Sequence, residues 1–188
     1  MDSDYLLFLD GQIEKVSRGF LETFLGNAQR PYVGAVGGRV YDNSGRLVAG
    51  AKILDLKGLA GDAFEGLRFG YTGYFHKAVL QQNFHAVSGK AMMVRRTSFL
   101  QAGGFSEEVE DRYKDVDLCL KLEQLGLKNV YDPGVVLLCQ GRTLQKKKAQ
   151  RTATVFRKKW KALLEQPDGY YNTNLSLESS DYRIREYP

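Results

Sequence analysis

Acidic residues stand at two points where an apolar segment ends or begins, and carboxylates in such places can accept protons or face a bound ligand. Asp10 closes the short apolar run LLFL, at the carboxyl end of a predicted strand, where open α/β sheets bind ligands. Asp115 and Asp117 open KDVDLCLKL, at the start of a predicted helix, where the helix dipole favours ionised carboxylates. Taken one at a time, turn and capping roles explain these residues equally well. A third acidic cluster, over 107–111, is interpreted as a solvated loop.

The positive charge of the chain is concentrated in one segment. The formal net charge is +5, but nine of the 27 basic residues and no acidic residue lie between Arg142 and Lys161, which leaves 18 basic against 22 acidic residues elsewhere. A local anionic partner such as a phosphate, a lipid head group or a nucleic acid would fit this segment. A solvated helix face explains it as well, and charge alone favours that interpretation.

Composition excludes several protein classes. The 188 residues are 43% hydrophobic and 26% charged, which is typical of one globular domain and not of a disordered chain. The two cysteines, Cys119 and Cys139, are too few for a disulfide scaffold, and no run resembles a signal peptide or a membrane span. We therefore expect a reducing, cytoplasmic setting. Cys119 is predicted to be a core residue, and His76 and His85 are assigned structural roles.

The elements that must position these carboxylates alternate between strands and helices, which predicts an α/β layered domain with a mainly parallel or mixed sheet. Strands are predicted at 6–9, at 33–48 with a turn at 43–45, at 84–95 with a bend at Gly89, and on both sides of a Pro-Gly turn within 128–139. Helices are predicted from an N-cap at Ser17 through Ala28, at 97–102, at 115–125 and from about Lys146 to Leu164. Residues 57–82 are predicted to form a long ordered loop.

Several motifs follow one another in a definite order across nearly the whole chain. They are LLFLD, GAVGGRV with a hairpin after it, AVSGKAMMVRR, GGFSEE, KDVDLCLKLEQLG, VYDPGVVLL and FRKKWKALLEQPDGYYNTNLSL. No single motif is specific, but the ordered series resembles the second half of a family 2 glycosyltransferase of the GT-A fold, of the bacterial surface-polysaccharide or rhamnosyltransferase-like kind. The resemblance implies a truncated GT-A domain, with a Rossmann-like mixed sheet flanked by helices, over residues 1–165. Residues 166–188 would form an extended tail packed on it.

The resemblance also implies a reaction and its participants. Such enzymes transfer a sugar, with inversion, from a nucleoside-diphosphate sugar to a saccharide or lipid-linked acceptor, in the cytoplasm or at the inner face of the membrane. Asp10 matches the aspartate that meets the diphosphate and its divalent metal, Mg²⁺ or Mn²⁺. Asp115 matches the catalytic base, and its place at a helix start should keep it ionised. Gly89, Gly103 and Gly104 match the acceptor side of the site.

Two residues depart from the family pattern at the expected metal site. Gln12 stands where a second aspartate follows the first, and Cys139 stands where a histidine ligand often follows the last strand. Both changes weaken the binding of a hard divalent cation. Asp10, Gln12, Arg142 and Lys146 are then the predicted diphosphate contacts, and two explanations stay open. Either Arg142 and Lys146 to Lys148 neutralise the diphosphate in place of the metal, or catalysis has been lost. The absent nucleotide-binding half of the family fold favours lost or incomplete activity.

A second function, of another class, fits the same departures. A non-catalytic binding or assembly module would keep the acceptor groove and use the basic helix against anionic lipid or a partner protein. Nucleic-acid binding is disfavoured, because the basic segment lacks interleaved exposed aromatic residues and a recognised nucleic-acid-binding fold. The sheet is expected to have an open edge at Tyr5 to Leu9, so we expect a homodimer or a partner chain along that edge.

Overall fold

The computed structural model describes residues 3–140 and 153–186. Its strands are β1 (Tyr5–Leu9), β2 (Ile13–Val16), β3 (Val33–Tyr41), β4 (Leu47–Ala49), β5 (Ala51–Leu54), β6 (Ala60–Asp62), β7 (Gln82–Phe84), β8 (Ala86–Val87), β9 (Ala91–Arg95) and β10 (Lys128–Cys139). Its α-helices are α1 (Phe20–Ala28), α2 (Arg96–Gln101), α3 (Lys114–Gln124), α4 (Thr154–Lys159) and α5 (Lys161–Leu164), with short helical turns at Leu56–Gly58, Tyr74–Val79 and Asp111–Tyr113. No helix in these two ranges is long and apolar enough to cross a lipid bilayer.

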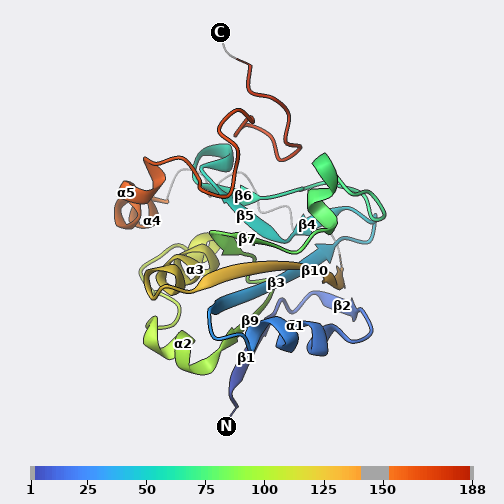
Figure 1. The fold of residues 1–188 in the computed structure, drawn as a ribbon, viewed down its shortest axis with the longest axis vertical. Helices are drawn as coiled ribbons and strands as arrows, with labels where there is room; N and C mark the ends of the chain where they lie inside the picture. The colour runs from blue at the N-terminus through green and yellow to red at the C-terminus, as the bar shows by residue number, and fades with distance from the viewer. Residues whose placement is uncertain (1–2, 141–152, 187–188) are drawn as a thin grey trace.

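A mixed sheet of seven strands forms the centre of the fold (Figure 1). Its order is β1-β9-β3-β10-β2, with β4 added beside β3 and β7 beside β10. β3 and β10 run parallel, whereas the other pairs in this sheet are antiparallel. The predicted fold class, a mixed α/β sheet flanked by helices, is therefore confirmed. Within the described residues β1 is an edge strand, paired on one side only.

The central strands are buried on both faces, and helices cover each face. On β9, Ala91 and Met93 belong to the core cluster that includes Phe24 of α1. Met92 and Val94 belong to the cluster that includes Leu118 and its neighbours on α3. Alternate side chains of a strand point to opposite sides, so α1 and α3 pack on opposite faces of the sheet. This explains why residues 91–94 form an uninterrupted apolar run.

A smaller sheet, with the order β6-β5-β8, lies on the α3 side together with the C-terminal tail (Figure 1). Tyr182 of the tail is 3% exposed and stacks on Phe64, with ring centroids 4.9 Å apart. Residues 57–82, predicted as a long loop, supply β6 and a helical turn to this region. Buried aromatic side chains thus hold the tail against the body of the protein.

The predicted N-cap of the first helix is wrong. α1 begins at Phe20 and is preceded by Gly19, whose φ of 73° lies in the left-handed region. Ser17 instead continues the pairing of β2, a strand that the sequence does not predict, with β10. Its N–H donates to the carbonyl oxygen of Val136 at 2.8 Å, and its Oγ accepts the N–H of Val136 at 3.2 Å. The strand contact takes the hydroxyl that a helix cap would need.

The Pro-Gly turn predicted within 128–139 is also wrong, since β10 is one strand. Its register against β3 shifts between Tyr131 and Val136, so the extra residues bulge out and the strand then resumes. Asp132 stabilises the bulge, because its Oδ1 accepts the N–H of Gly134 at 2.7 Å. Its Oδ2 accepts the side-chain amide of Asn27 at 2.5 Å, which ties the bulge to α1.

The last predicted helix is only partly described. Residues 146–152 lie outside the described ranges, and residues 154–164 form two short helices, α4 and α5, in place of one. Trp160 separates them, with φ −106° and ψ 17°. Its indole N–H donates to Asp117 at 2.9 Å, and this buried contact sets the position of the break.

Candidate functional site

A cavity of about 460 Å³ lies where β1 ends, beside the start of α3 and the smaller sheet. Charged residues from separate elements line it: Asp10 after β1, Lys90 before β9, Lys52 and Asp62 from the smaller sheet, and Asp115 from α3. The two carboxylates predicted as site residues, Asp10 and Asp115, therefore line one cavity. Its polar lining suits a ligand with many hydrogen-bonding groups.

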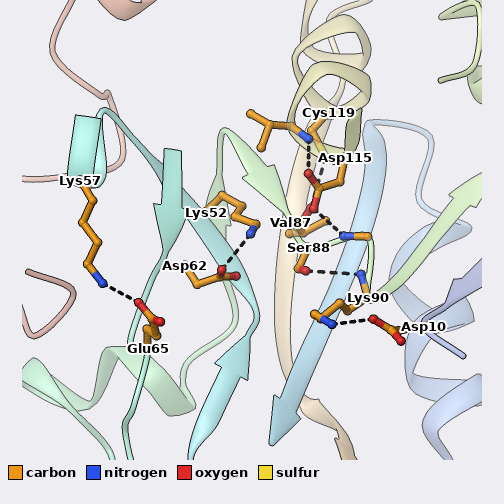
Figure 2. Close-up of polar contacts among 12 residues, drawn as sticks. Asp10, Lys52, Lys57, Asp62, Glu65, Val87, Ser88, Lys90, Asp115 and Cys119 are labelled. Carbon is orange, nitrogen blue, oxygen red and sulfur yellow. Dashed lines mark hydrogen bonds and ion pairs between the residues drawn. The ribbon is translucent and has the colours of Figure 1, made fainter. Parts of the chain in front are cut away.

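The segment 88–90, which connects β8 to β9, contacts both of these carboxylates (Figure 2). The N–H of Gly89 donates to Oδ2 of Asp115 at 2.9 Å. The Nζ of the next residue, Lys90, lies 2.5 Å from Oδ2 of Asp10. The relative position of the two carboxylates is therefore set by one short segment that is hydrogen-bonded to each of them.

Asp115 lies in the first turn of α3, as predicted. Its Oδ1 accepts the N–H of Val116 at 2.8 Å, and its Oδ2 accepts the N–H of Gly89. A Cβ added at Gly89 would lie 3.0 Å from the Cβ of Asp115, which is closer than side chains normally approach. A side chain at position 89 would therefore require Asp115 to move by a few tenths of an ångström.

Asp10 is held by main-chain contacts on both sides. Its N–H donates to the carbonyl oxygen of Lys90 at 2.9 Å, and its Oδ1 accepts the N–H of Gln12, also at 2.9 Å. Burial alone would raise the pKa of Asp10, but the hydrogen bonds from Lys90 and from the main chain of Gln12 outweigh it and lower the pKa. Asp10 is an ionised, hydrogen-bonded carboxylate at the cavity wall.

Gln12 and Cys139, at the two positions where the family resemblance predicts metal ligands, lie close to Asp10. The N–H of Gln140 donates to the carbonyl oxygen of Gln12 at 2.9 Å, which brings the end of β10 to the turn after β1. Burial raises the pKa of the Cys139 thiol, so it stays protonated at neutral pH, and Gln12 carries no charge. In residues 3–140 and 153–186, no group of three His, Cys, Asp or Glu side chains is arranged to hold a metal ion. These residues do not fit Mg²⁺ or Mn²⁺.

A second ion pair in the cavity is not found by sequence reasoning. The Nζ of Lys52 lies 2.9 Å from Oδ2 of Asp62, with both side chains largely buried (Figure 2). Burial alone would lower the pKa of Lys52, but the carboxylates of Asp62 and Asp115 raise it, so Lys52 is a fixed cation. These residues come from β5 and β6, and nothing in their local sequence marks them. Pairing of the two strands brings them together.

The other predicted residues have varied places. Arg142 and Lys146 lie outside the described residues. Cys119 is fully buried, which confirms its predicted core position. His76 is exposed, whereas His85 pairs with Glu123 at 2.8 Å and does not line the cavity.

Gly103 and Gly104 follow α2 and adopt φ values of 78° and 64°. This left-handed conformation ends the helix and is open to glycine without strain. Phe105, the next residue, lines the cavity, so the turn borders the site on the side that the resemblance assigns to the acceptor.

The fold is of the GT-A glycosyltransferase type. It is similar to a crystal structure of GalNAc-T7 with UDP, GalNAc and Mn²⁺, with a TM-score of 0.53 over 74% of this chain and 28% of that chain. The two sequences are 14% identical, and the likeness therefore concerns the fold. It confirms the GT-A part of the predicted resemblance.

No protein-family model matches the sequence. Two curated proteins are similar to nearly the whole chain: the uncharacterized protein y4gI of Sinorhizobium fredii and the O-antigen biosynthesis protein RfbC of Myxococcus xanthus. The first is 30% identical over 188 residues, covering 95% of this chain and 21% of its own length. The second is 30% identical over 195 residues, covering 98% of this chain and 15% of its own length. The chain thus spans about a fifth, or less, of the length of these relatives.

Proposed function

We propose that this chain carries the acceptor side and the diphosphate end of a glycosyltransferase site. It would transfer a sugar, with inversion, from a nucleoside-diphosphate sugar to a saccharide or lipid-linked acceptor. The observation that carries the proposal is the cavity in which neighbouring residues, Gly89 and Lys90, contact Asp115 and Asp10. The GT-A fold supports it, and the likeness to part of an O-antigen biosynthesis protein supports polysaccharide synthesis as its setting.

In the proposed reaction Asp115 is the general base. It takes the proton of an acceptor hydroxyl, whose oxygen attacks the anomeric carbon of the donor sugar. The bond from that carbon to the diphosphate breaks, and the nucleoside diphosphate leaves with the electron pair. Attack and departure must take place on opposite faces of the sugar. In the proposed arrangement the donor sugar lies between Asp115 and Asp10, which line the same cavity.

We further propose that other donor contacts come from a second copy or another chain beside β1. Within the described residues this strand is paired on one side only, and an unpaired edge can accept another strand. The proposed setting is the cytoplasm or the inner face of the membrane. A strictly monomeric species in sedimentation at high protein concentration would contradict the pairing.

The test is a transfer assay with UDP-, GDP- and dTDP-linked sugars, with and without saccharide and lipid-linked acceptors. Release of nucleoside diphosphate and the anomeric configuration of the product are followed by NMR. We expect inversion, and release that depends on Asp115. A product that keeps its configuration, or equal release by Asp115→Asn, would overturn the proposal.

A second candidate is a non-catalytic binding or assembly module. The observation that favours it is that both carboxylate oxygens of Asp10 already accept hydrogen bonds, from Lys90 and Gln12. Such a module would bind a saccharide acceptor and release no nucleoside diphosphate from any donor. The same assay, combined with calorimetric titration of acceptors, separates the two functions.

A further inference from the structure

We propose that the ammonium group of Lys90, held by Asp10, is the cation that binds the departing diphosphate, so that this site works without a divalent metal ion. The inference rests on the proposed function and assigns a residue to it. It starts from a disagreement: the fold type suggests a metal beside Asp10, but the residues around Asp10 do not fit one.

Lys90 is fixed through both its main chain and its side chain. Its carbonyl oxygen accepts the N–H of Asp10, and its own N–H donates to Oγ of Ser88 at 3.3 Å. The side chain then returns to Oδ2 of Asp10 (Figure 2). It is 21% exposed. An ammonium group carries three N–H donors, so it can bridge a carboxylate oxygen and a phosphate oxygen.

The charges next to Asp10 disfavour a bound metal ion. The carboxylate of Asp10 is paired with the ammonium of Lys90, and the side chain of Gln12 is neutral. A divalent cation next to Oδ2 would be repelled by the ammonium already there, and it would find one carboxylate in place of the several oxygens that it prefers. A diphosphate, in contrast, would meet a positive group.

Two other lysines that line the cavity are paired with carboxylates other than Asp10. Lys52 is paired with Asp62, and Lys114 with Asp111 at 2.8 Å. Among the lysines of the described residues that line the cavity, Lys90 is the one paired with Asp10. It also follows Gly89 directly, so the group that would bind the leaving diphosphate and the main chain that holds Asp115 belong to one segment.

The chemical role of Lys90 needs no other reactant. When the bond between the anomeric carbon and the diphosphate oxygen breaks, that oxygen keeps the electron pair and the leaving group gains one negative charge. An N–H of Lys90 donates a hydrogen bond to the diphosphate, and its proton stays on nitrogen. The proton of the acceptor hydroxyl goes to Asp115, so charge and protons balance.

The first experiment is calorimetric titration of the protein with UDP and with inorganic pyrophosphate, each with Mn²⁺ and with EDTA. We expect binding that is equal in both media, and roughly tenfold or greater weakening in Lys90→Met. Lys128→Met is the control. It removes the same charge from an exposed residue at the first position of β10, the end of that strand opposite to Cys139. Binding that requires Mn²⁺, or that both variants weaken equally, overturns the inference.

The second experiment asks whether Lys90 excludes the metal. Free Mn²⁺ is measured by electron paramagnetic resonance in the presence of wild-type protein and of the double variant Lys90→Met, Gln12→Asp. We expect no binding by the wild type and clear binding by the double variant, which offers two carboxylates without the ammonium. Binding by the wild type, or no gain in the double variant, contradicts the charge argument.

The inference and the proposed function can fail separately. If transfer depends on Asp115 but proceeds equally in Lys90→Met, only the role of Lys90 is lost. If the protein binds pyrophosphate through Lys90 without Mn²⁺ but releases no nucleoside diphosphate from any donor, the diphosphate site stands and the transferase function falls. Absence of diphosphate binding in every medium overturns the role of Lys90, and the transfer assay then decides the function.

Discussion

Asp115 and Asp117 have the same side chain, lie two residues apart in the first turn of one helix, and yet have opposite environments. Asp115 lines the cavity and accepts hydrogen bonds from two main-chain N–H groups. Asp117 is fully buried and accepts from Ser106, Lys121, Lys159 and Trp160 at 2.6, 3.1, 2.7 and 2.9 Å. Residues two apart on an α-helix point about 200° apart, so one faces the ligand space and the other faces the packed interior.

This comparison separates a carboxylate available for chemistry from one used for architecture. Burial and the number of donors make the difference, not residue type or place in the helix. Every donor to Asp117 comes from a side chain, and two of these belong to Lys159 and Trp160 around the end of α4. Asp117 therefore fixes the C-terminal helices to α3, while Asp115 stays at the cavity wall.

The largest effect is expected on the transfer rate, from a substitution of Asp115, the carboxylate that lines the cavity. In Asp115→Asn the side-chain oxygen can still accept the N–H of Gly89, but the group no longer takes a proton at neutral pH. We expect transfer to fall by roughly 10² to 10⁴-fold with little change in the urea midpoint of unfolding. Asp111→Asn is the control, since Asp111 lines the same cavity but is 95% exposed. Equal loss in both variants would argue against a specific base.

The next largest effect is expected on stability, from a substitution of Asp117, the buried carboxylate. Asp117→Asn leaves Lys121 and Lys159 without their buried counter-charge, and we expect the free energy of unfolding to fall by about 3 kcal/mol. Urea denaturation measures it. Glu108→Gln is the control, because Glu108 is 62% exposed and lies 3.8 Å from Lys159. If the two variants are equally stable, Asp117 is not the anchor.

The pH dependence of the Asp117 effect has a definite sign. Burial raises the pKa of Asp117, but hydrogen bonds from Lys159, Ser106, Trp160 and Lys121 outweigh it and hold the pKa below its usual value. The folded protein thus favours the ionised form, and this stabilisation is present above the unfolded pKa of about 3.9. It is lost as the pH falls through the lower folded value. The stability difference between the wild type and Asp117→Asn should therefore shrink at acid pH.

Local patterns predict part of this site. Asp10 ends a short apolar strand and Asp115 begins an amphipathic helix, so the elements that carry them are visible in a few neighbouring residues. The fold class follows from the alternation of such elements. Local patterns do not distinguish Asp115 from Asp117, because the donors around Asp117 come from residues up to 43 positions away, and only the family resemblance separates the two.

Long-range pairing hides the rest. Lys90 contacts Asp10 across 80 residues, because β1 and β9 are neighbours in the sheet. Lys52 and Asp62 meet only when β5 pairs with β6. Pro133 suggests a turn, but the bulge around Asp132 lets the strand continue. None of these contacts can be predicted from the residue types in a short stretch of sequence.

A smaller effect is expected from a substitution that displaces Asp115 and leaves Asp117 in place. In Gly89→Ala the new methyl group would lie 3.0 Å from the Cβ of Asp115 and displace the carboxylate. We expect transfer to fall by about ten- to a hundredfold, with a loss of stability of about 1 kcal/mol. Gly26→Ala is the control, since a methyl group there meets no atom within 4 Å. Unchanged transfer in Gly89→Ala would mean that the position of Asp115 tolerates movement.

The smallest effect concerns a third carboxylate of α3, Glu123, which anchors the tail through His85. The ring of His85 lies 2.8 Å from Glu123 and 3.6 Å from Asp168 of the tail. Burial would lower the pKa of His85, and nearby Lys128 opposes protonation, but Glu123 and Asp168 outweigh both and raise the pKa. The folded state favours the protonated ring. The resulting stabilisation is complete below the unfolded pKa of about 6.5 and is lost as the pH rises through the higher folded value.

Hydrogen exchange of residues 166–186 at pH 6 and pH 8.5, corrected for the intrinsic rates, measures this anchor. We expect the tail of the wild type to be more protected at pH 6 by about 1 kcal/mol or less, since the pair is partly exposed. His85→Gln should remove the pH dependence, while transfer stays unchanged because His85 does not line the cavity. If the pH dependence persists in His85→Gln, a group other than His85 anchors the tail. Asp117 would then be the carboxylate of α3 that stabilises the fold, in contrast to Asp115, which lines the cavity.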